Sequence, residues 1–328
     1  MNLIPDFDLS RLNTMGLASH ARFGAVISTP EEIDELTGLS LETGLPLRIL
    51  GGGSNLVLRD EIAAVVGVMG TKGRTVERRA DGTALVTAQA GEDWSEFVGW
   101  TIAQGIPGLE NLGGIPGTVG AAPVQNIGAY GVELAERLDS LVVWDLVDRQ
   151  RRRFSAQDCE FSYRQSLFKR SGNRFVVLEA TFALPDTWTA NLSYPGLDSL
   201  PADADAATIH ERVLAVRGAK LPNWRLLGNA GSFFHNPIVR SDVADGIANV
   251  PRYPQRDGNV KLSAAWLIEA CGLKGVREGQ AGVYDRHALI LVNHGGATYA
   301  EIAGLASRIV NTVRERFGVA LVQEPIEL

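Results

Sequence analysis

The chain has 328 residues, of which 45% are hydrophobic and 21% are charged, and its formal net charge is −7. This length allows roughly two or three domains, and the composition is typical of a globular protein. The negative charge disfavours nucleic acid, and no apolar run approaches the ~18 residues of a membrane span, so we expect neither a nucleic-acid nor a membrane partner.

The polar residues that bind metals show no ligand pattern. The two cysteines lie far apart and the five histidines have no metal-ligand spacing, so we expect no metal site. The N-terminal residues lack the basic start and apolar core of a secretion signal. A cytoplasmic location is therefore the simplest expectation.

The first third of the sequence predicts short alternating elements. Acidic residues open a helix expected at 30–43, and an apolar run predicts a buried strand at 46–50. Further strands are expected at 56–58 and 63–69, with a turn between them.

From residue 74 to about 184 the pattern favours β structure, interrupted by one helix at 94–104. Strands are expected at 84–88, 138–146 and 175–184. The arginines within 149–153 have no interleaved aromatic residues, which indicates a solvated strand edge or turn and not a binding patch.

The C-terminal third becomes more helical after a Pro- and Asp-rich connecting loop at 186–205. The apolar periodicity there predicts helices at 206–217, 263–270 and 299–317, a buried strand at 288–293 and a short strand at 319–322. Because the helices and strands do not alternate regularly, the expected class is α+β.

Two glycine-rich segments carry the first functional signal. The shorter one, Gly51–Asn55 (GGGSN), follows a predicted strand. It is not the dinucleotide fingerprint, because Leu56 occupies the last glycine position, and no P-loop motif occurs. The segment predicts a nest of donors for a phosphate group, with a tight turn that binds no ligand as the alternative.

The longer segment, Gly108–Gly131, reads GLENLGGIPGTVGAAPVQNIGAYG and contains seven glycines but one charged residue. Glycine allows positive φ and lets a ligand or another backbone come close. We interpret the segment as a wall around a phosphate-bearing cofactor. A buried glycine-rich crossover is the alternative.

A third motif, Gly228–Pro237 (GNAGSFFHNP), places Ser232 between a glycine and two aromatic residues. It is not a nucleophile elbow, since G-x-S-x-G is absent. A lone serine is usually structural, but these neighbours can present one hydroxyl in a water-poor pocket, with Asn236 nearby.

Four charged residues are weaker candidates. Arg164 lies in the segment YRQS at 163–166, and Glu324 lies near the C-terminus; ordinary surface positions are the alternative for both. Arg217 and Lys220, at i and i+3 on a predicted helix, can bind one phosphate together or be ordinary surface charges.

Taken in this order, the motifs resemble the UDP-N-acetylenolpyruvoylglucosamine reductase family over nearly the full length. The resemblance rests on Asn13-Thr14, GGGSNLVL at 51–58, the long glycine-rich segment at 108–131, YRQS at 163–166, GNAGSFFHNP at 228–237 and Glu324. The segment LSYPG at 192–196 is similar to the tyrosine-bearing loop of the family's first type. The chain departs from the family pattern at Met15, where phenylalanine is usual, and at Ile326, where arginine is usual.

The resemblance implies an FAD-binding fold of the vanillyl-alcohol-oxidase (PCMH) type in two subdomains, followed by a smaller α+β domain for the UDP-sugar. It implies a first FAD-binding subdomain at 1–71, joined by the tail 321–328, a second at 72–218 and the UDP-sugar domain at 219–320. We expect a monomer.

The resemblance also implies an activity, the NADPH-dependent reduction of UDP-N-acetylglucosamine enolpyruvate to UDP-N-acetylmuramate, for peptidoglycan. FAD is bound non-covalently, NADPH reduces it and leaves, and hydride passes from flavin N5 to the enolpyruvyl carbon farther from the carboxylate. The other carbon is then protonated. Because the resulting enediolate-like species is strongly basic, a serine hydroxyl can serve as the acid.

Residue roles follow from the matched motifs. Ser232 is expected to be the proton donor, with Arg164 and Glu324 stabilising the charge on the substrate carboxylate and Glu324 protonated or bridged there. Tyr194, Arg217, Lys220 and Asn236 are expected to bind the substrate. The residues expected to contact FAD are Gly51, Gly52, Gly53, Ser54, Asn55, Gly114, Ile115, Pro116, Gly117, Gly120, Ala121, Asn126 and Gly128.

Two other functions compete with this one. The first is another flavin oxidoreductase of the same fold, acting on a sugar or an alcohol. The second is a non-catalytic protein that binds a nucleotide sugar, against which the presence of Ser232, Arg164 and Glu324 argues.

Overall fold

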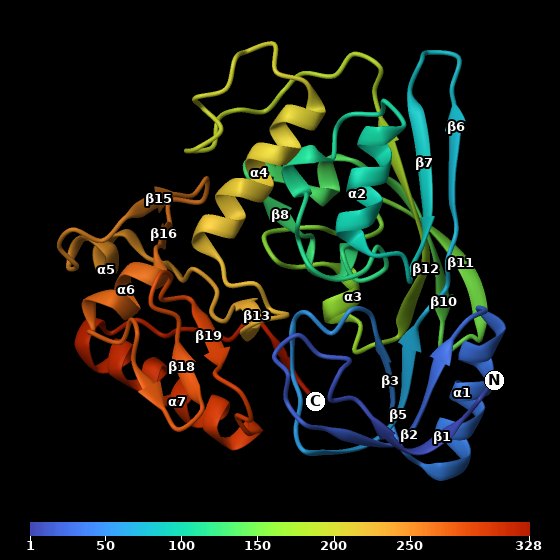
Figure 1. Cartoon of the computed structure of the whole chain (residues 1–328), viewed down its shortest axis with the longest axis horizontal. Coiled ribbons are helices and arrows are strands. Elements are labelled where there is room, and N and C mark those ends of the chain that lie inside the picture. Colours follow the sequence, from blue (N-terminus) through green and yellow to red (C-terminus); the bar gives the residue numbers. More distant parts are fainter. The chain divides into compact units, whose positions relative to one another are not determined.

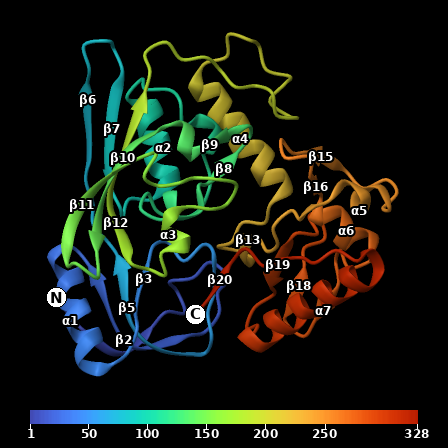
Figure 2. The same ribbon diagram turned by 180° about the vertical axis from the view of Figure 1, so that it is seen from behind.

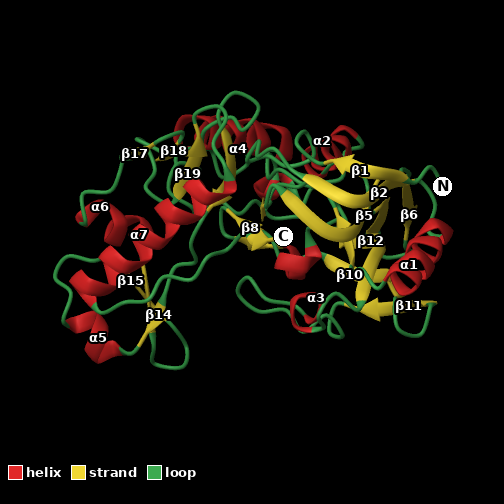
Figure 3. Cartoon of the chain, turned by 90° about the horizontal axis from the view of Figure 1, so that it is seen from below, coloured by secondary structure: helices red, strands yellow, loops and turns green.

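The computed structural model describes all 328 residues, and the chain forms two compact units (Figure 1). Unit 1 comprises residues 1–7, 21–52 and 63–219, and unit 2 comprises residues 8–20, 53–62 and 220–328. Both units contain helices and strands (Figure 3). No helix is both long enough and apolar enough to cross a bilayer. The three-part division expected from the resemblance stays a prediction.

Unit 1 begins with a four-stranded sheet in the order β1-β2-β5-β3. Its helix α1 packs Ile33 and Leu36 against Ile27 and Val65 of the sheet, all four fully buried. The elements are β1 (Ile4–Asp8), β2 (His20–Ile27), α1 (Glu31–Thr43), β3 (Leu47–Leu50) and β5 (Glu61–Met69).

The second sheet of unit 1 has five antiparallel strands in the order β11-β10-β12-β7-β6. Helix α2 lies against it (Figure 2), and the rings of Trp94 and Phe97 lie 5.7 and 5.5 Å from the ring of Phe182 in β12. The elements are β6 (Arg74–Arg78), β7 (Ala84–Gln89), α2 (Trp94–Ala103), β10 (Leu138–Asp145), β11 (Gln150–Ser155) and β12 (Phe175–Leu184).

Short elements and one long helix complete unit 1. Helix α4 buries Ile209 and Val213 in a small cluster with Tyr130 and Leu197. The elements are the 3-10 turns Glu110–Leu112, Pro123–Gln125 and Leu134–Glu136, with β8 (Gly128–Ala129), β9 (Val132–Glu133), α3 (Leu167–Arg170) and α4 (Ala206–Lys220), whose last residue belongs to unit 2.

Unit 2 is built on an antiparallel sheet in the order β13-β19-β18-β17. Helix α7 supplies a fully buried stripe of Ile302, Leu305, Ile309 and Val313 to its core. The elements are β13 (Gly228–Ser232), α6 (Ala264–Ala270), β17 (Arg277–Glu278), β18 (Ala281–Val283), β19 (Ile290–Asn293) and α7 (Tyr299–Phe317).

Two smaller sheets also belong to unit 2. One has the strand order β14-β16-β15, and in the other the C-terminal β20 runs parallel to β4. The elements are β4 (Leu56–Val57), β14 (Ile238–Val239), α5 (Ser241–Asp245), β15 (Arg252–Pro254), β16 (Val260–Leu262) and β20 (Ile326–Glu327).

Most of the long predicted elements are confirmed, with ends that shift by a few residues at most. The arginine-rich stretch is the edge strand β11, preceded by a turn with Arg149 at φ 50°, as expected. The strand predicted at 319–322 is wrong: these residues form no regular strand, and only Gln323 makes an isolated bridge, with Phe234. The apolar character of 319–322 instead reflects burial of Val319 and Leu321 in the unit 2 core.

Candidate active site

Backbone hydrogen bonds hold the middle of the glycine-rich segment in place. The amides of Val119 and Gly120 donate to the carbonyls of Glu92 and Ala90, both at 2.9 Å. Trp94 makes two further hydrogen bonds to the segment. Its backbone amide donates to the carbonyl of Gly117 at 3.0 Å, and its buried indole Nε1 donates to the carbonyl of Leu112 at 2.8 Å. The segment is thus a fixed wall of unit 1.

The two glycine-rich segments pack closely against each other. A Cβ on Gly51 would lie 2.5 Å from Thr118 Oγ1 and 3.0 Å from Ala121 Cβ, and a Cβ on Gly52 would lie 2.9 Å from Gly117 Cα. Thr118 Oγ1 is buried and has no hydrogen-bond partner, an arrangement that costs about 1–3 kcal/mol. Close glycine backbones beside an unsatisfied hydroxyl fit the diphosphate of a dinucleotide cofactor.

The shorter glycine-rich segment continues into unit 2 at Gly53, whose φ is +62°. A Cβ there would lie 1.9 Å from the carbonyl oxygen of Leu12, so this position admits only glycine. The carbonyl of Gly53 accepts from the amide of Thr14 at 3.1 Å. Asn55 Nδ2 donates to the carbonyl of Glu324 at 3.3 Å and so joins this segment to the C-terminal tail.

Arg164 lies in a turn that is attached to the glycine-rich segment. Its φ of +55° is unusual for a residue other than glycine. Its Nη2 donates to the carbonyl of Gly128 at 3.5 Å, and the buried Ser166 Oγ donates to the carbonyl of Val124 at 2.6 Å. The segment YRQS therefore brings Arg164 to the wall formed by residues 124–128.

Asn126 shapes the same wall from inside. Its backbone is left-handed at φ 42°, and its side chain is buried. Its Nδ2 donates to Glu133 Oε2 at 3.0 Å and to the carbonyl of Ser162 at 3.3 Å, while its Oδ1 accepts from the amide of Ala135 at 3.0 Å. The hydrogen bonds of this amide are used within the protein, so its effect on a cofactor is through the backbone it holds.

Two residues expected to bind the substrate, Tyr194 and Arg217, gather with Tyr130 in unit 1. The rings of Tyr194 and Tyr130 meet edge to face at 4.8 Å, and Tyr130 is hydrogen-bonded to Arg217. Burial lowers the pKa of Arg217, against the opposing effect of Tyr130, and burial raises the pKa of Tyr130. Gly114 makes room for this cluster, because a Cβ there would lie 3.2 Å from Arg217 Cδ. The structure therefore adds Tyr130, which the sequence showed only as part of GAYG.

The loop that carries Tyr194 is tied to the glycine-rich segment by buried polar groups. Glu110 is 2% exposed, and its Oε1 accepts from the indole of Trp188 at 2.9 Å. Its Oε2 accepts from the amide of Gly108 at 2.6 Å. Asn111 Nδ2 donates to the carbonyls of Asn191 and Tyr130, both at 2.9 Å. The predicted connecting loop at 186–205 is thus irregular but anchored.

In unit 2, Ser232 ends strand β13 beside a break in the strand pairing. The register with β19 shifts between Asn229 and Ser232, and Gly231 within the shift has φ +70° with open space where a Cβ would be. Phe233 and Phe234 that follow are each 1% exposed and anchor the strand. A bulge of this kind re-aims the neighbouring side chain, here that of Ser232.

The C-terminal tail runs antiparallel along the residues after Ser232. The amide of Glu324 donates to the carbonyl of Phe233 at 2.9 Å, and the amide of His235 donates to the carbonyl of Val322 at 2.9 Å. The structure thus brings Glu324 to the residue next to Ser232. His235 Nδ1 lies 3.3 Å from Glu324 Oε2, a contact that the sequence did not reveal.

Asn236 and Lys220 also belong to unit 2, with different settings. Asn236 Oδ1 accepts from the amide of Ala264 at the start of α6 at 2.9 Å, which orients its Nδ2 as a donor. Lys220 is exposed at the end of α4. The pKa of His287 is lowered mainly by the burial of its imidazole and also by the positive charge of Lys220.

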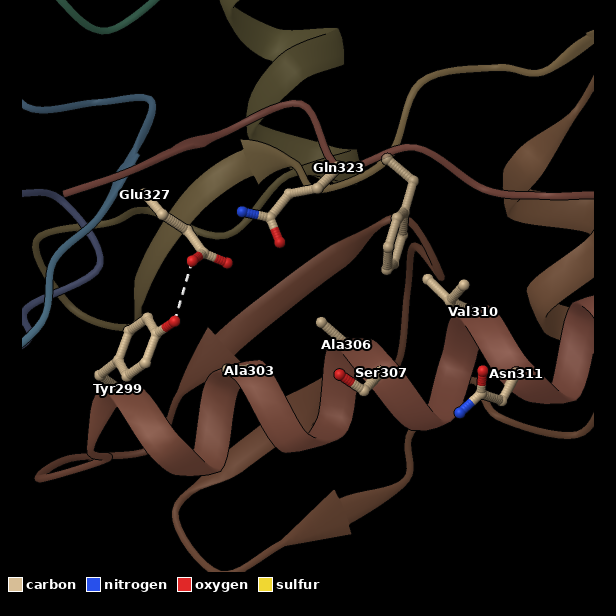
Figure 4. A pocket seen from close by; sticks show the side chains of 9 residues that line it. Tyr299, Ala303, Ala306, Ser307, Val310, Asn311, Gln323 and Glu327 are labelled. Carbon is tan, nitrogen blue, oxygen red and sulfur yellow. Dashed lines mark hydrogen bonds between the residues drawn. The ribbon is translucent and has the colours of Figure 1, made fainter.

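A cavity of about 370 Å³ lies between α7 and the tail in unit 2 (Figure 4). At one end Tyr299 Oη donates to Glu327 Oε2 at 2.8 Å. Phe234 and Gln323 line it, but none of the residues predicted for catalysis or ligand binding does. The cavity is therefore not the predicted site.

Comparison with known proteins agrees with this geometry. Residues 24–150 match the family model described as an FAD binding domain, and residues 222–327 match that of the UDP-N-acetylenolpyruvoylglucosamine reductase C-terminal domain. The crystal structure of UDP-N-acetylenolpyruvylglucosamine reductase from Thermus caldophilus is similar with a TM-score of 0.68 at 24% identity, over 99% of this chain and 98% of that one. These matches confirm the expected FAD-binding α+β fold with a further C-terminal domain.

Curated relatives cover the whole length. The chain is 46% identical to UDP-N-acetylenolpyruvoylglucosamine reductase of Burkholderia cenocepacia, over 99% of this chain and 97% of that protein. The identity to the enzyme of the same name from Burkholderia vietnamiensis is also 46%, with the same coverage. The chain belongs to the UDP-N-acetylenolpyruvoylglucosamine reductase family.

Proposed function

We propose that this chain is an NADPH-dependent UDP-N-acetylmuramate dehydrogenase that reduces UDP-N-acetylglucosamine enolpyruvate with FAD as its cofactor. The observation that carries the proposal is the pairing of the tail with residues 233–235, which joins Glu324 to Phe233, the residue after Ser232. The family membership supports the same conclusion.

The residues at the meeting of the two glycine-rich segments fit FAD. Gly51 and Gly52 pack closely against Thr118 and Gly117, and the unsatisfied Thr118 Oγ1 can donate to a phosphate oxygen. When bound, FAD supplies the hydride that NADPH provides. The remaining predicted FAD contacts, from Ser54 and Asn55 to Gly128, belong to this proposal.

Ser232 donates the proton in this proposal. After hydride addition the substrate carries two negative charges spread over its carboxylate and the adjacent carbon, which is then strongly basic. A hydroxyl placed at that carbon can protonate it without prior activation, a role worth about 10²–10⁴ in rate. Gly231 before it has open space where a Cβ would lie, so this neighbour places no side chain beside the hydroxyl.

Charge on the substrate carboxylate is stabilised by Arg164 and Glu324. The guanidinium of Arg164 is a permanent cation, and the turn at 162–165 holds it rigidly. Glu324 can stabilise a carboxylate only as a hydrogen-bond donor or through a bridging cation, because two bare carboxylates repel. Donors placed in advance where charge develops are the main source of such stabilisation.

The UDP-sugar is held by a separate set of residues. Arg217 supplies a half-buried cation beside Tyr130, and Tyr194 packs over the same tyrosine. Lys220 and Asn236, the other two residues expected to bind the substrate, offer a cation and an amide donor. In a chain with net charge −7 these local cations attract a diphosphate while the protein as a whole does not bind anions indiscriminately.

The test separates the two half-reactions in a rapid-mixing experiment. Ser232→Ala should leave reduction of the bound flavin by NADPH unchanged and slow its reoxidation by UDP-N-acetylglucosamine enolpyruvate by about 10²-fold or more. Ser241→Ala, an exposed serine of α5, is the matched control and should behave as the wild type. Loss of the first half-reaction alone would show that Ser232 is not the proton donor. The monomeric state and the cytoplasmic location stay predictions.

A further inference from the structure

Helix α4 packs on two adjacent residues of the long glycine-rich segment, Gly113 and Gly114, within unit 1. A Cβ on Gly113 would lie 2.3 Å from Cδ2 and 2.6 Å from Nε2 of His210. A Cβ on Gly114 would lie 2.7 Å from Leu214 Cδ2 and 3.2 Å from Arg217 Cδ. Because His210, Leu214 and Arg217 stand at i, i+4 and i+7, they form one face of the helix, and this face packs directly on backbone.

The backbone conformation of Gly113 does not require glycine. Its φ is −61° and its ψ is 150°, an extended conformation that any residue adopts. The third nearest atom to a Cβ there, the carbonyl oxygen of Glu110, would lie 3.1 Å away, a tight contact that a small shift relieves. Gly114 differs, because its φ of +69° favours glycine by itself. At Gly113 it is therefore the closeness of His210 on α4 that excludes a side chain.

The ring of His210 fills the space over Gly113 by its shape. Its Nε2 is buried and has no hydrogen-bond partner. Burial lowers the pKa of His210, against the opposing effects of Glu110 and Glu211. Packing, and not a hydrogen bond of Nε2, therefore determines how closely α4 approaches the glycine-rich segment at this point.

Arg217, two turns further along the same face, depends on where the helix lies. Its side chain is hydrogen-bonded to Tyr130, and no carboxylate raises its pKa. The position of the guanidinium is thus set by α4 and by one tyrosine. A displacement of about 1 Å can change the action of such a group on its substrate about 10²-fold.

We propose that Gly113 is a positioning residue: because it has no side chain, α4 can approach the glycine-rich segment, and this approach places Arg217 for the UDP-sugar. The inference rests on the proposed function, since it takes Arg217 as a contact of the substrate. Neither Gly113 nor His210 takes part in hydride or proton transfer. An effect on Arg217 as a binding group should therefore appear in KM and leave kcat nearly unchanged.

The experiment introduces Gly113→Ala into the FAD-loaded enzyme. The added methyl group should push the His210 ring and α4 outward and raise the KM for UDP-N-acetylglucosamine enolpyruvate about ten-fold or more, with kcat within about two-fold of the wild type. The FAD content and the rate of flavin reduction at saturating NADPH should also stay within about two-fold. Gly218→Ala is the matched control, because Gly218 lies in the same helix with no atom within 4 Å of the position of a Cβ, and it should leave the KM unchanged.

Two double-mutant cycles test the path of the effect. His210→Ala removes the ring that the new methyl group meets, so the double variant of Gly113→Ala and His210→Ala should return the KM to within about three-fold of the wild type. In an Arg217→Ala background, whose KM is already raised, Gly113→Ala should add less than about two-fold.

Unfolding midpoints show whether each variant is folded. If Gly113→Ala does not fold, His210→Trp takes its place, because it crowds the same contact from the helix and should raise the KM likewise. An unchanged KM in Gly113→Ala or in Arg217→Ala, no recovery in the double variant, or a full further rise without Arg217 each overturns the role of Gly113. If instead the wild-type flavin is not reoxidised by the enolpyruvyl sugar at all, the proposed function fails.

Discussion

Replacing Gly53 by alanine tests whether the lack of a side chain at this position is what lets the backbone of residues 12–13 pack against it. The left-handed φ of +62° by itself costs an alanine about 1–2 kcal/mol. The new Cβ would also lie 1.9 Å from the Leu12 carbonyl oxygen and 2.8 Å from Asn13 Cα, so the backbone must move by about 1 Å to reach the closest distance that Cβ atoms tolerate.

That movement disturbs a buried network. Asn13 Nδ2 donates to the carbonyls of Leu9 and Leu17 at 3.0 and 2.9 Å, and its Oδ1 accepts from the amide of Leu17 at 3.0 Å. Each such hydrogen bond contributes about 1 kcal/mol, so we expect Gly53→Ala to lower the free energy of unfolding by about 4 kcal/mol.

The matched control is Gly272→Ala, in the same unit. Gly272 has φ +72° but no atom within 4 Å of the position of a Cβ, so it carries the backbone cost without the clash. We expect a loss of about 1–2 kcal/mol there, measured for both variants by urea unfolding with tryptophan fluorescence. Equal losses in the two variants would refute the steric reasoning.

Three further predictions concern unit 1. Because the buried Thr118 hydroxyl has no partner in the protein, Thr118→Val should change the free energy of unfolding of the flavin-free protein by less than about 1 kcal/mol. The same substitution should weaken FAD binding about ten-fold in a fluorescence titration, and an unchanged affinity would contradict the prediction. The hydrogen bond from Arg174 is the largest cause that holds the pKa of Asp145 well below its usual range. Since the folded pKa is the lower one, the stability difference between wild type and Asp145→Asn should be present at pH 7 and shrink as the pH falls below about 4; a constant difference in acid unfolding curves would argue against it. Trp188→Phe should destabilise the protein by about 1–3 kcal/mol, because the buried Glu110 Oε1 loses its hydrogen-bond donor. It should also raise the KM for the UDP-sugar with little change in kcat, and an unchanged KM would show that this contact does not affect substrate binding.

Long periodic elements were predictable because their signal is local. Helix α7 shows this best: its apolar stripe packs on the unit 2 core, and Thr298 with Glu301 forms the capping box at its start. Strand β13 was not predicted, since GNAGS has neither alternation nor β-branched residues. Its strand geometry comes from pairing with β19, a partner remote in the sequence.

The motifs by themselves determined the family, the FAD cofactor and the candidate residues, because each motif is a short run whose residue types are required by backbone geometry or chemistry. Only the tertiary structure decided which residues meet. The pairing of the tail with residues 233–235 brought Glu324 to Phe233, the residue after Ser232, and revealed His235 beside Glu324. The packing of the two glycine-rich segments left Thr118 without a partner. Contacts of this kind depend on hydrogen bonds between distant backbones, on which local periodicity carries no information.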